Sequence, residues 1–253
     1  MKRKKVSTLI AAALALTMTV CSSSTAIATS ELTAESKPAT QYTIDANQEV
    51  YALLDFEDTA EFENATKGQI ASPDTLDIYD ENGKLVWSQT AYAFLDQDAP
   101  DTANPSLWRN TQLNHIYGLF EVTDGIYQVR GYDMSNVTFI KGDTGWIVID
   151  PLMSVECAAA AFSLVEENLG TFPVKAVIYS HSHVDHFGGV KGIISEEDVQ
   201  FGDVQVIAPE GFEKHAVSEN IYAGTAMGRR ASYQYGTMLE GCDKGSLAIC
   251  IGR

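Results

Sequence analysis

The sequence predicts an α/β fold organised around a strand–helix–strand unit, and three observations lead to this prediction. Short runs rich in β-branched and aromatic residues recur between residues 126 and 149, separated by turn residues. A helical pattern of apolar residues follows, from an N-cap at Ser154 to a closing Gly170. A nearly continuous apolar run at residues 174–179 then predicts a strand that is buried on both faces.

Each element of this unit has its own local signal. Residues 126–130, 137–140 and 146–149 are predicted strands, and Gly142 and Gly145 mark the turn between the last two. The helix carries apolar side chains at helical spacing: Val155, Ala158, Ala159, Phe162 and Val165. The crossover between the two parallel strands should be right-handed. The loop that leaves the second strand then opens at the carboxyl edge of the sheet, where α/β proteins form ligand sites.

The chain ahead of this unit is less regular. Residues 29–50 lack sustained periodicity and are predicted to be a flexible leader. Residues 51–116 are predicted to form an N-terminal extension, in which turn residues at 80–83 followed by 84–87 indicate a hairpin. The aromatic content of this extension indicates that it packs against another surface.

The first 28 residues have the three parts of a secretory signal peptide. Basic residues at positions 2–5 precede an apolar run at residues 9–20, and a small-x-small site follows, with cleavage expected after Ala28. The apolar run is too short for a membrane anchor, which needs about 20 apolar residues. Lipidation of Cys21 is a competing interpretation, but Val20 stands where such sites usually have a small residue. We therefore expect a secreted or periplasmic protein without a membrane span.

The composition is that of an acidic globular protein. The 253 residues include 17 Lys and Arg against 34 Asp and Glu, which gives a net charge of −17. Removal of the four basic residues of the signal peptide lowers this charge to −21. Such a charge repels phosphate backbones and anionic lipid surfaces, so nucleic-acid binding is not expected.

Three cysteines remain after cleavage, at positions 157, 242 and 250. An odd number cannot pair completely within one chain, even in an oxidising compartment. Cys157 lies in the apolar helical stretch and is expected to be a small buried hydrophobe. Cys242 and Cys250 can bridge a short loop, although the sequence does not establish it. No pair has the spacing of a cysteine zinc site.

The loop after residues 174–179 carries the metal-binding chemistry. Three of the five histidines lie in it, and the predicted ligands are His181, His183, Asp185 and His186. On an extended backbone His181 and His183 point to the same side, so that their imidazoles can converge on one ion. Asp185 and His186 can then serve a second ion, with Gly188 and Gly189 allowing close backbone approach before a following helix. The alternative is a solvated polar loop with clustered histidines.

Imidazole and carboxylate ligands without thiolate suit Zn²⁺, with Mn²⁺ or Fe²⁺ as further options. Paired ions about 3.5 to 4 Å apart can lower the pKa of a bound water and hold both the attacking and the leaving oxygen in a displacement. Hydrolysis is therefore the predicted class of reaction.

The motif His-x-His-x-Asp-His after a buried strand resembles the metal signature of the metallo-β-lactamase fold. Further stretches are similar to the secreted alkyl sulfatases of that superfamily, the dodecyl-sulfate hydrolases. These stretches are PSLWR at 105–109, GLF at 118–120, GIY at 125–127 and NIYAGTAMGRRASYQYG at 220–236.

The resemblance implies an αββα sandwich of which residues 117–253 supply only the first half. It implies two zinc ions, one held by His181 and His183 and the other by Asp185 and His186, and a small alkyl sulfate ester as substrate. Members of the family are longer, and a homodimerisation domain, a lipid-carrier-like domain and the remaining metal ligands follow downstream. The chain is therefore expected to be an N-terminal fragment of such an enzyme.

Three further positions carry alternatives. Arg229 and Arg230 can bind a sulfate group, since guanidinium pairs well with its oxygens, or can anchor a helix by stacking and ion pairs. Asp150 ends a strand and can contact an imidazole of the metal loop, or can only cap the next helix. His115 and His215 are expected to have no part in metal binding.

Three functional hypotheses follow. The first is zinc-dependent hydrolysis of alkyl sulfate esters. The second is a non-catalytic fragment that at most binds metal weakly, because four ligands shared between two ions leave each ion short of its usual coordination. The third is another hydrolase of the superfamily, of lactamase or thioesterase type.

Overall fold

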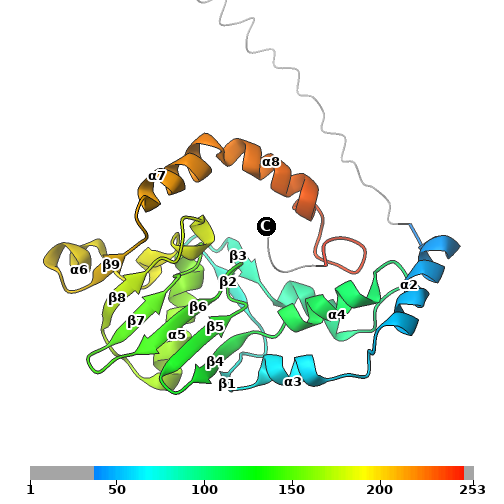
Figure 1. Ribbon diagram of the computed structural model, residues 1–253, viewed down its shortest axis with the longest axis horizontal. Coiled ribbons are helices and arrows are strands. Elements are labelled where there is room, and N and C mark those ends of the chain that lie inside the picture. Colours follow the sequence, from blue (N-terminus) through cyan, green and yellow to red (C-terminus); the bar gives the residue numbers. More distant parts are fainter. Residues whose placement is uncertain (1–36, 248–253) are drawn as a thin grey trace, which may run out of the picture. The chain divides into compact units, whose positions relative to one another are not determined.

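The computed structural model describes residues 37–247, and its centre is a seven-stranded mixed sheet (Figure 1). The strand order is β1-β4-β5-β6-β7-β8-β9; pairing is antiparallel from β1 to β7 and parallel from β7 to β9. The strands are β1 (Gln69–Ala71), β4 (Gly118–Thr123), β5 (Ile126–Arg130), β6 (Val137–Lys141), β7 (Trp146–Ile149), β8 (Val174–Ile178) and β9 (Gln205–Ile207). The four strands predicted from hydrophobic patterning are confirmed to within one residue at each end.

Helix α5 (Val155–Leu169) connects the parallel strands β7 and β8, which confirms the βαβ unit. The Ser154 side chain caps the helix by accepting a hydrogen bond from the Cys157 amide at 3.1 Å, and the helix ends at Gly170 with φ 90°. The predicted apolar face is partly wrong, because Val155 is exposed. The residues buried on α5 are Cys157, Ala158, Ala161 and Val165.

Small residues on α5 let the helix lie close to one face of the sheet. The core beneath it is aromatic: the Phe162 ring stacks on Phe139 at 5.9 Å, and Phe139 meets Trp146 edge to face at 6.1 Å. Trp146 is fully buried and also contacts the Phe172 ring at 5.8 Å. Full burial of such side chains stabilises the fold by about 1.5 to 3 kcal/mol each.

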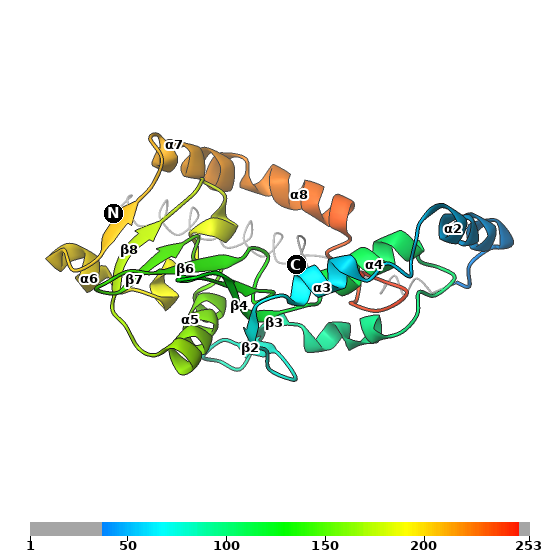
Figure 2. The same ribbon diagram turned by 60° about the horizontal axis from the view of Figure 1, so that its bottom comes forward.

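The opposite face of the sheet is only partly buried. Cross-strand pairing aligns Ile140 with Ile126 and Ile147, and Ile149 with Ile178. All five isoleucines keep intermediate exposure. In Figure 2, α5 lies on one side of the sheet, and α7 and α8 lie on the other. One covered face and one incompletely covered face agree with the predicted first half of an αββα sandwich.

The N-terminal extension contains the predicted hairpin, formed by β2 (Asp77–Tyr79) and β3 (Leu85–Ser88). Its helical segments are α3 (Ala60–Thr66), the 3₁₀ helix η1 (Thr90–Asp96) and α4 (Pro105–Asn114). The extension is tied to the sheet, since its strand β1 pairs with β4. The domain boundary at residues 116 and 117 stays a prediction.

The prediction of an irregular leader up to residue 50 is wrong for its last part, because α2 (Gln41–Leu53) is helical. Thr40 caps this helix, accepting a hydrogen bond from the Thr43 amide at 3.3 Å. The Asn47 side chain also donates to the carbonyl of Asp101 at 2.8 Å, and these two residues are 54 positions apart in the sequence. The predicted signal peptide and residues 29–36 lie outside the described residues.

The chain after β8 forms short helices rather than the predicted helix directly after the two glycines. Gly188 and Gly189 are followed by a single 3₁₀ turn, so no α-helix N-terminus is available to an anion there. The elements are the 3₁₀ turns η2 (Val184–His186) and η3 (Val190–Gly192), α6 (Glu196–Phe201), α7 (Phe212–Val217), the π-helical turn η4 (Ser218–Tyr222) and α8 (Gly224–Tyr235). Within residues 37–247, no helix has the length and apolar character needed to cross a membrane.

Candidate metal centre

The predicted metal loop begins where β8 ends, beside the carboxyl end of β7. Because β7 and β8 are parallel neighbours, Asp150 after β7 and the loop after β8 meet at the same edge of the sheet. The amide of Asp150 donates to the carbonyl of Ile178 at 3.0 Å, which joins the two strand ends. The topology therefore brings a carboxylate to the histidine-rich loop.

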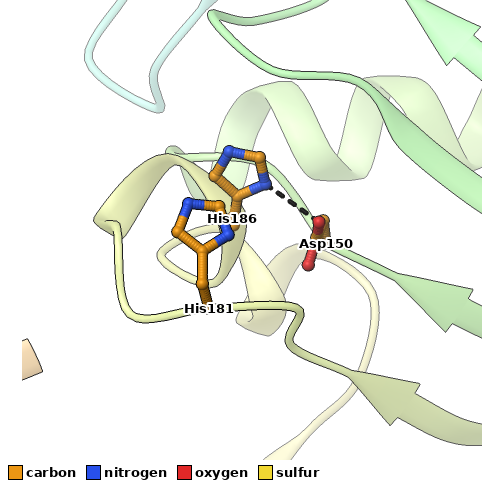
Figure 3. A group of neighbouring side chains, drawn as sticks. All are labelled: Asp150, His181 and His186. Carbon is orange, nitrogen blue, oxygen red and sulfur yellow. Dashed lines mark hydrogen bonds and ion pairs between the residues drawn. The ribbon is translucent and has the colours of Figure 1, made fainter. Parts of the chain in front are cut away.

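Asp150, His181 and His186 form one group of potential metal ligands, with ligand atoms within 4.8 Å of one another (Figure 3). The rings of His181 and His186 are 4.1 Å apart between centroids. His186 Nδ1 lies 2.9 Å from Asp150 Oδ2. All three residues have intermediate burial, so the group is open to solvent on one side.

Asp150 orients both imidazoles, one directly and one through Ser180. The Ser180 hydroxyl donates to Asp150 Oδ2 at 2.6 Å and lies 2.9 Å from His181 Nδ1. When each Nδ1 carries the proton, His186 donates to Asp150 and His181 donates to the Ser180 oxygen. Both Nε2 atoms then keep a lone pair for a metal ion, the tautomer that ligating histidines need. The alternative in which Asp150 only caps the next helix is excluded by these contacts.

His183 and Asp185 lie beside this group, His183 next to His181 and Asp185 next to His186. The His183 ring is 4.6 Å from that of His181 between centroids, and the convergence of these two imidazoles on one ion stays a prediction. Its Nε2 faces Glu219 Oε1 at 3.0 Å, and its side chain is 56% exposed. Asp185 Oδ2 is 3.3 Å from His186 Nε2. The assignment of these four residues to two separate ions stays a prediction.

Sequence patterns gave no indication of Glu219. This residue comes from the π-helical turn η4, more than thirty residues after the motif, and it reaches His183 only because the chain folds back. No periodicity or spacing links it to the histidines. Asp150, by contrast, had a signal, since it ends a predicted strand next to the loop.

The backbone near Asp150 is strained. Asp150 has φ 56° and Leu152 has φ 62°, in the left-handed region that residues other than glycine rarely adopt. The predicted close approach of the two glycines is confirmed beside this segment. A Cβ at Gly188 would lie 2.3 Å from the carbonyl oxygen of Met153, and one at Gly189 would lie 2.4 Å from that of Pro151.

The other predicted positions lie apart from the cluster. Arg229 and Arg230 are exposed on α8, and neither forms an ion pair within the described part of the chain. Their role in sulfate binding stays a prediction. His215 is exposed on α7, and His115 Nδ1 bonds Gln89 Oε1 at 2.8 Å in the extension.

Two imidazoles and one carboxylate form a donor set that suits a divalent metal ion. The set has no thiolate: Cys157 is buried on α5, and Cys242, the other free cysteine of the described residues, is not in the group. Such nitrogen and oxygen donors are typical of zinc and of related transition metals. The residues present therefore fit a metal ion, as the sequence predicted.

Known proteins resemble this chain in sequence and in structure. The profile of the metallo-beta-lactamase superfamily matches residues 130–249. A linear primary-alkylsulfatase from Pseudomonas sp. is 51% identical over 218 residues, which are 85% of this chain and 32% of that protein. An alkyl/aryl-sulfatase from Saccharomyces cerevisiae is 49% identical over 83% of this chain and 33% of its own length.

A solved structure has the same fold. The stereoselective inverting sec-alkylsulfatase from Pseudomonas sp. superposes with a TM-score of 0.78 at 50% identity, over 84% of this chain and 35% of that one. The chain thus spans about a third of the length of the relatives it matches. The chain thus contains a metallo-beta-lactamase domain, and most of its residues match about a third of known alkylsulfatases at about 50% identity.

Proposed function

We propose that this chain carries metal-binding groups of a zinc-dependent hydrolase that acts on alkyl sulfate esters. The observation that carries the proposal is the cluster of Asp150, His181 and His186. It lies in a chain that is about 50% identical to enzymes named as alkylsulfatases.

The roles of the residues follow from their contacts. His181 and His186 present Nε2 to the metal while Asp150 and Ser180 hold their Nδ1 atoms. His183 and Asp185 extend the donor set on either side. When bound, zinc supplies Lewis acidity and lowers the pKa of a bound water, which suits hydrolysis of an ester.

Arg229 and Arg230 are proposed to bind the sulfate group. Both are exposed on α8, which follows the turn that places Glu219 against His183. A guanidinium group can donate two parallel hydrogen bonds to two oxygens of one anion. Local positive charge of this kind offsets the net charge of the chain, which is −17.

The protein is further proposed to act outside the cytoplasm. The basic residues, apolar run and small-x-small site of residues 1–28 support export with cleavage after Ala28. Mass spectrometry of protein isolated from its native compartment tests this, since an N-terminus at Thr29 is expected and an intact Met1 contradicts it.

The central experiment measures metal content and activity together. Purified chain is expected to bind zinc by elemental analysis and to release sulfate from dodecyl sulfate. The double variant His181→Ala/His186→Ala should lose both properties, and His215→Ala, on the exposed face of α7, should keep them. Wild-type protein that holds no zinc contradicts the proposal.

A second candidate is a metal-binding chain without activity of its own. Within the described residues, the group that can hold a metal offers only three donors, and the chain spans about a third of its relatives' length. Zinc binding without turnover of any ester would favour it. Turnover of a lactam or thioester in a substrate panel, with alkyl sulfates untouched, would instead favour another hydrolase of the superfamily.

A further inference from the structure

Asp133 is a buried carboxylate outside the candidate metal centre. It lies in the loop between β5 and β6, and only 7% of the residue is exposed. Its Oδ1 accepts a hydrogen bond from the Met134 amide at 2.7 Å. Its Oδ2 accepts from the amides of Met153 and Ser154 at 3.0 and 3.1 Å. A buried carboxylate that accepts three hydrogen bonds from backbone amides acts on the backbone that it holds.

The segment that Asp133 holds is the strained one next to the metal ligands. Met153 and Ser154 directly follow Leu152, which, like Asp150, has a positive φ angle that residues other than glycine rarely adopt. Such conformations persist only where neighbouring contacts fix them. Hydrogen bonds to a carboxylate are the strong kind, so the two that Asp133 Oδ2 accepts help to hold this segment in place.

A second residue of the same loop reaches the histidine motif. Ser135 is 9% exposed, and its hydroxyl donates to the backbone carbonyl of Asp185 in a short hydrogen bond. From the other side, the Gly189 amide donates to the carbonyl of Leu152 at 2.9 Å. The loop between β5 and β6 therefore bonds both segments that carry the candidate ligands.

We infer that Asp133 and Ser135 are positioning residues of the metal centre. Asp133 fixes the backbone from which Asp150 reaches His186, and Ser135 fixes the turn that presents Asp185 and His186. Neither side chain bonds a candidate ligand's donor atom, so both act through the backbone. The inference rests on the proposed metal site.

The test uses the full chain and three variants. Ser135→Ala removes the hydroxyl, whereas Ser135→Thr keeps a hydroxyl at this position. Asp133→Asn puts an NH₂ group where the carboxylate accepts hydrogen bonds. Thr111→Val is the matched control, because the buried Thr111 hydroxyl also donates to a backbone carbonyl, that of Trp108 at 2.7 Å, within α4. Zinc affinity, the visible spectrum with Co²⁺ as a probe, and amide exchange of the metal-free protein are measured for each.

Ser135→Ala and Asp133→Asn should lower zinc affinity about 10- to 100-fold and alter the Co²⁺ spectrum. Ser135→Thr should recover most of the affinity, and Thr111→Val should lose stability but not affinity. In metal-free protein, amide exchange should accelerate at residues 150–154 in Asp133→Asn and at 183–188 in Ser135→Ala.

Two results overturn the inference. The first is that Ser135→Ala and Asp133→Asn both keep the zinc affinity and the Co²⁺ spectrum of the wild-type protein. The second is that amide exchange is unchanged in these variants, both at residues 150–154 and at residues 183–188. If wild-type protein binds neither zinc nor cobalt, the proposed function fails, and the exchange data alone decide whether the loop holds the two segments.

Discussion

His186 Nδ1 and Asp150 Oδ2 lie 2.9 Å apart, and this contact fixes which nitrogen of His186 can face a metal ion. Asp150→Asn should therefore weaken zinc binding by about 10- to 100-fold, because an amide is a poorer acceptor for the imidazole proton. Asn tolerates the left-handed backbone at this position, so the change does not add strain. Zinc titration checks the prediction. The control is Asp143→Asn in the exposed turn before β7, and equal affinities of the two variants would contradict it.

Gly189→Ala should destabilise the protein by several kcal/mol. The new Cβ would lie 2.4 Å from the Pro151 carbonyl oxygen and 2.5 Å from that of Ser154, and backbone cannot move away cheaply. Gly228→Ala in α8 is the matched control, since nothing lies within 4 Å of its Cβ position. That change should stabilise the helix by up to about 1 kcal/mol. Thermal unfolding of both variants measures the difference. Similar melting temperatures would show that Gly189 does not pack against the segment at residues 151–154.

The βαβ unit was predictable because its signals are local. Period-two and period-3.6 patterns, the Ser154 cap and Gly170 depend on residues next to one another, and β5 and β7 match their predicted bounds. The metal loop was predictable for the same reason, since its histidines lie within six residues. Asp150 could be anticipated from topology, because adjacent parallel strands end at one edge.

The parts that sequence patterns missed depend on contacts distant in the chain. Helix α2 has no amphipathic pattern, and a side-chain contact from Asn47 to Asp101 ties it to the rest of the chain. The 3₁₀ turn η3 after Gly189 replaces the expected helix, because the glycines press against the segment at 151–155. Glu219 reaches His183 only through the folding back of the chain at η4.

Cys157 and Cys242 should differ sharply in reactivity. Burial is the main cause and the nearby Asp133 carboxylate a smaller one, and together they raise the pKa of the Cys157 thiol to about 12. Because the thiolate is the reactive form, a thiol reagent at pH 8 should leave Cys157 unmodified in folded protein and modify it after denaturation. Cys242 is partly exposed and forms no disulfide within the described residues, which leave out Cys250, so it should react in the native state. Peptide mapping distinguishes the two sites, and rapid native labelling of Cys157 would contradict its burial on α5.

His115 should make the stability of the extension depend on pH. Burial holds the pKa of His115 below its usual value, and the nearby Asp96 offsets part of this effect. The folded state therefore favours the neutral imidazole, whose Nδ1 hydrogen is donated to the buried Gln89 side chain at 2.8 Å. This contribution to stability is fully present above about pH 6.5, the unfolded value, and is lost as the pH falls towards the lower folded pKa.

His115→Gln keeps a donor for Gln89 but cannot titrate. As the pH falls from about 7.5 to 5.5, the free energy of unfolding of the wild-type protein should therefore decrease relative to that of this variant. Urea unfolding at a series of pH values measures it, and the other four histidines contribute equally to both proteins. Curves that stay parallel through this range would mean that His115 is not held neutral by the fold.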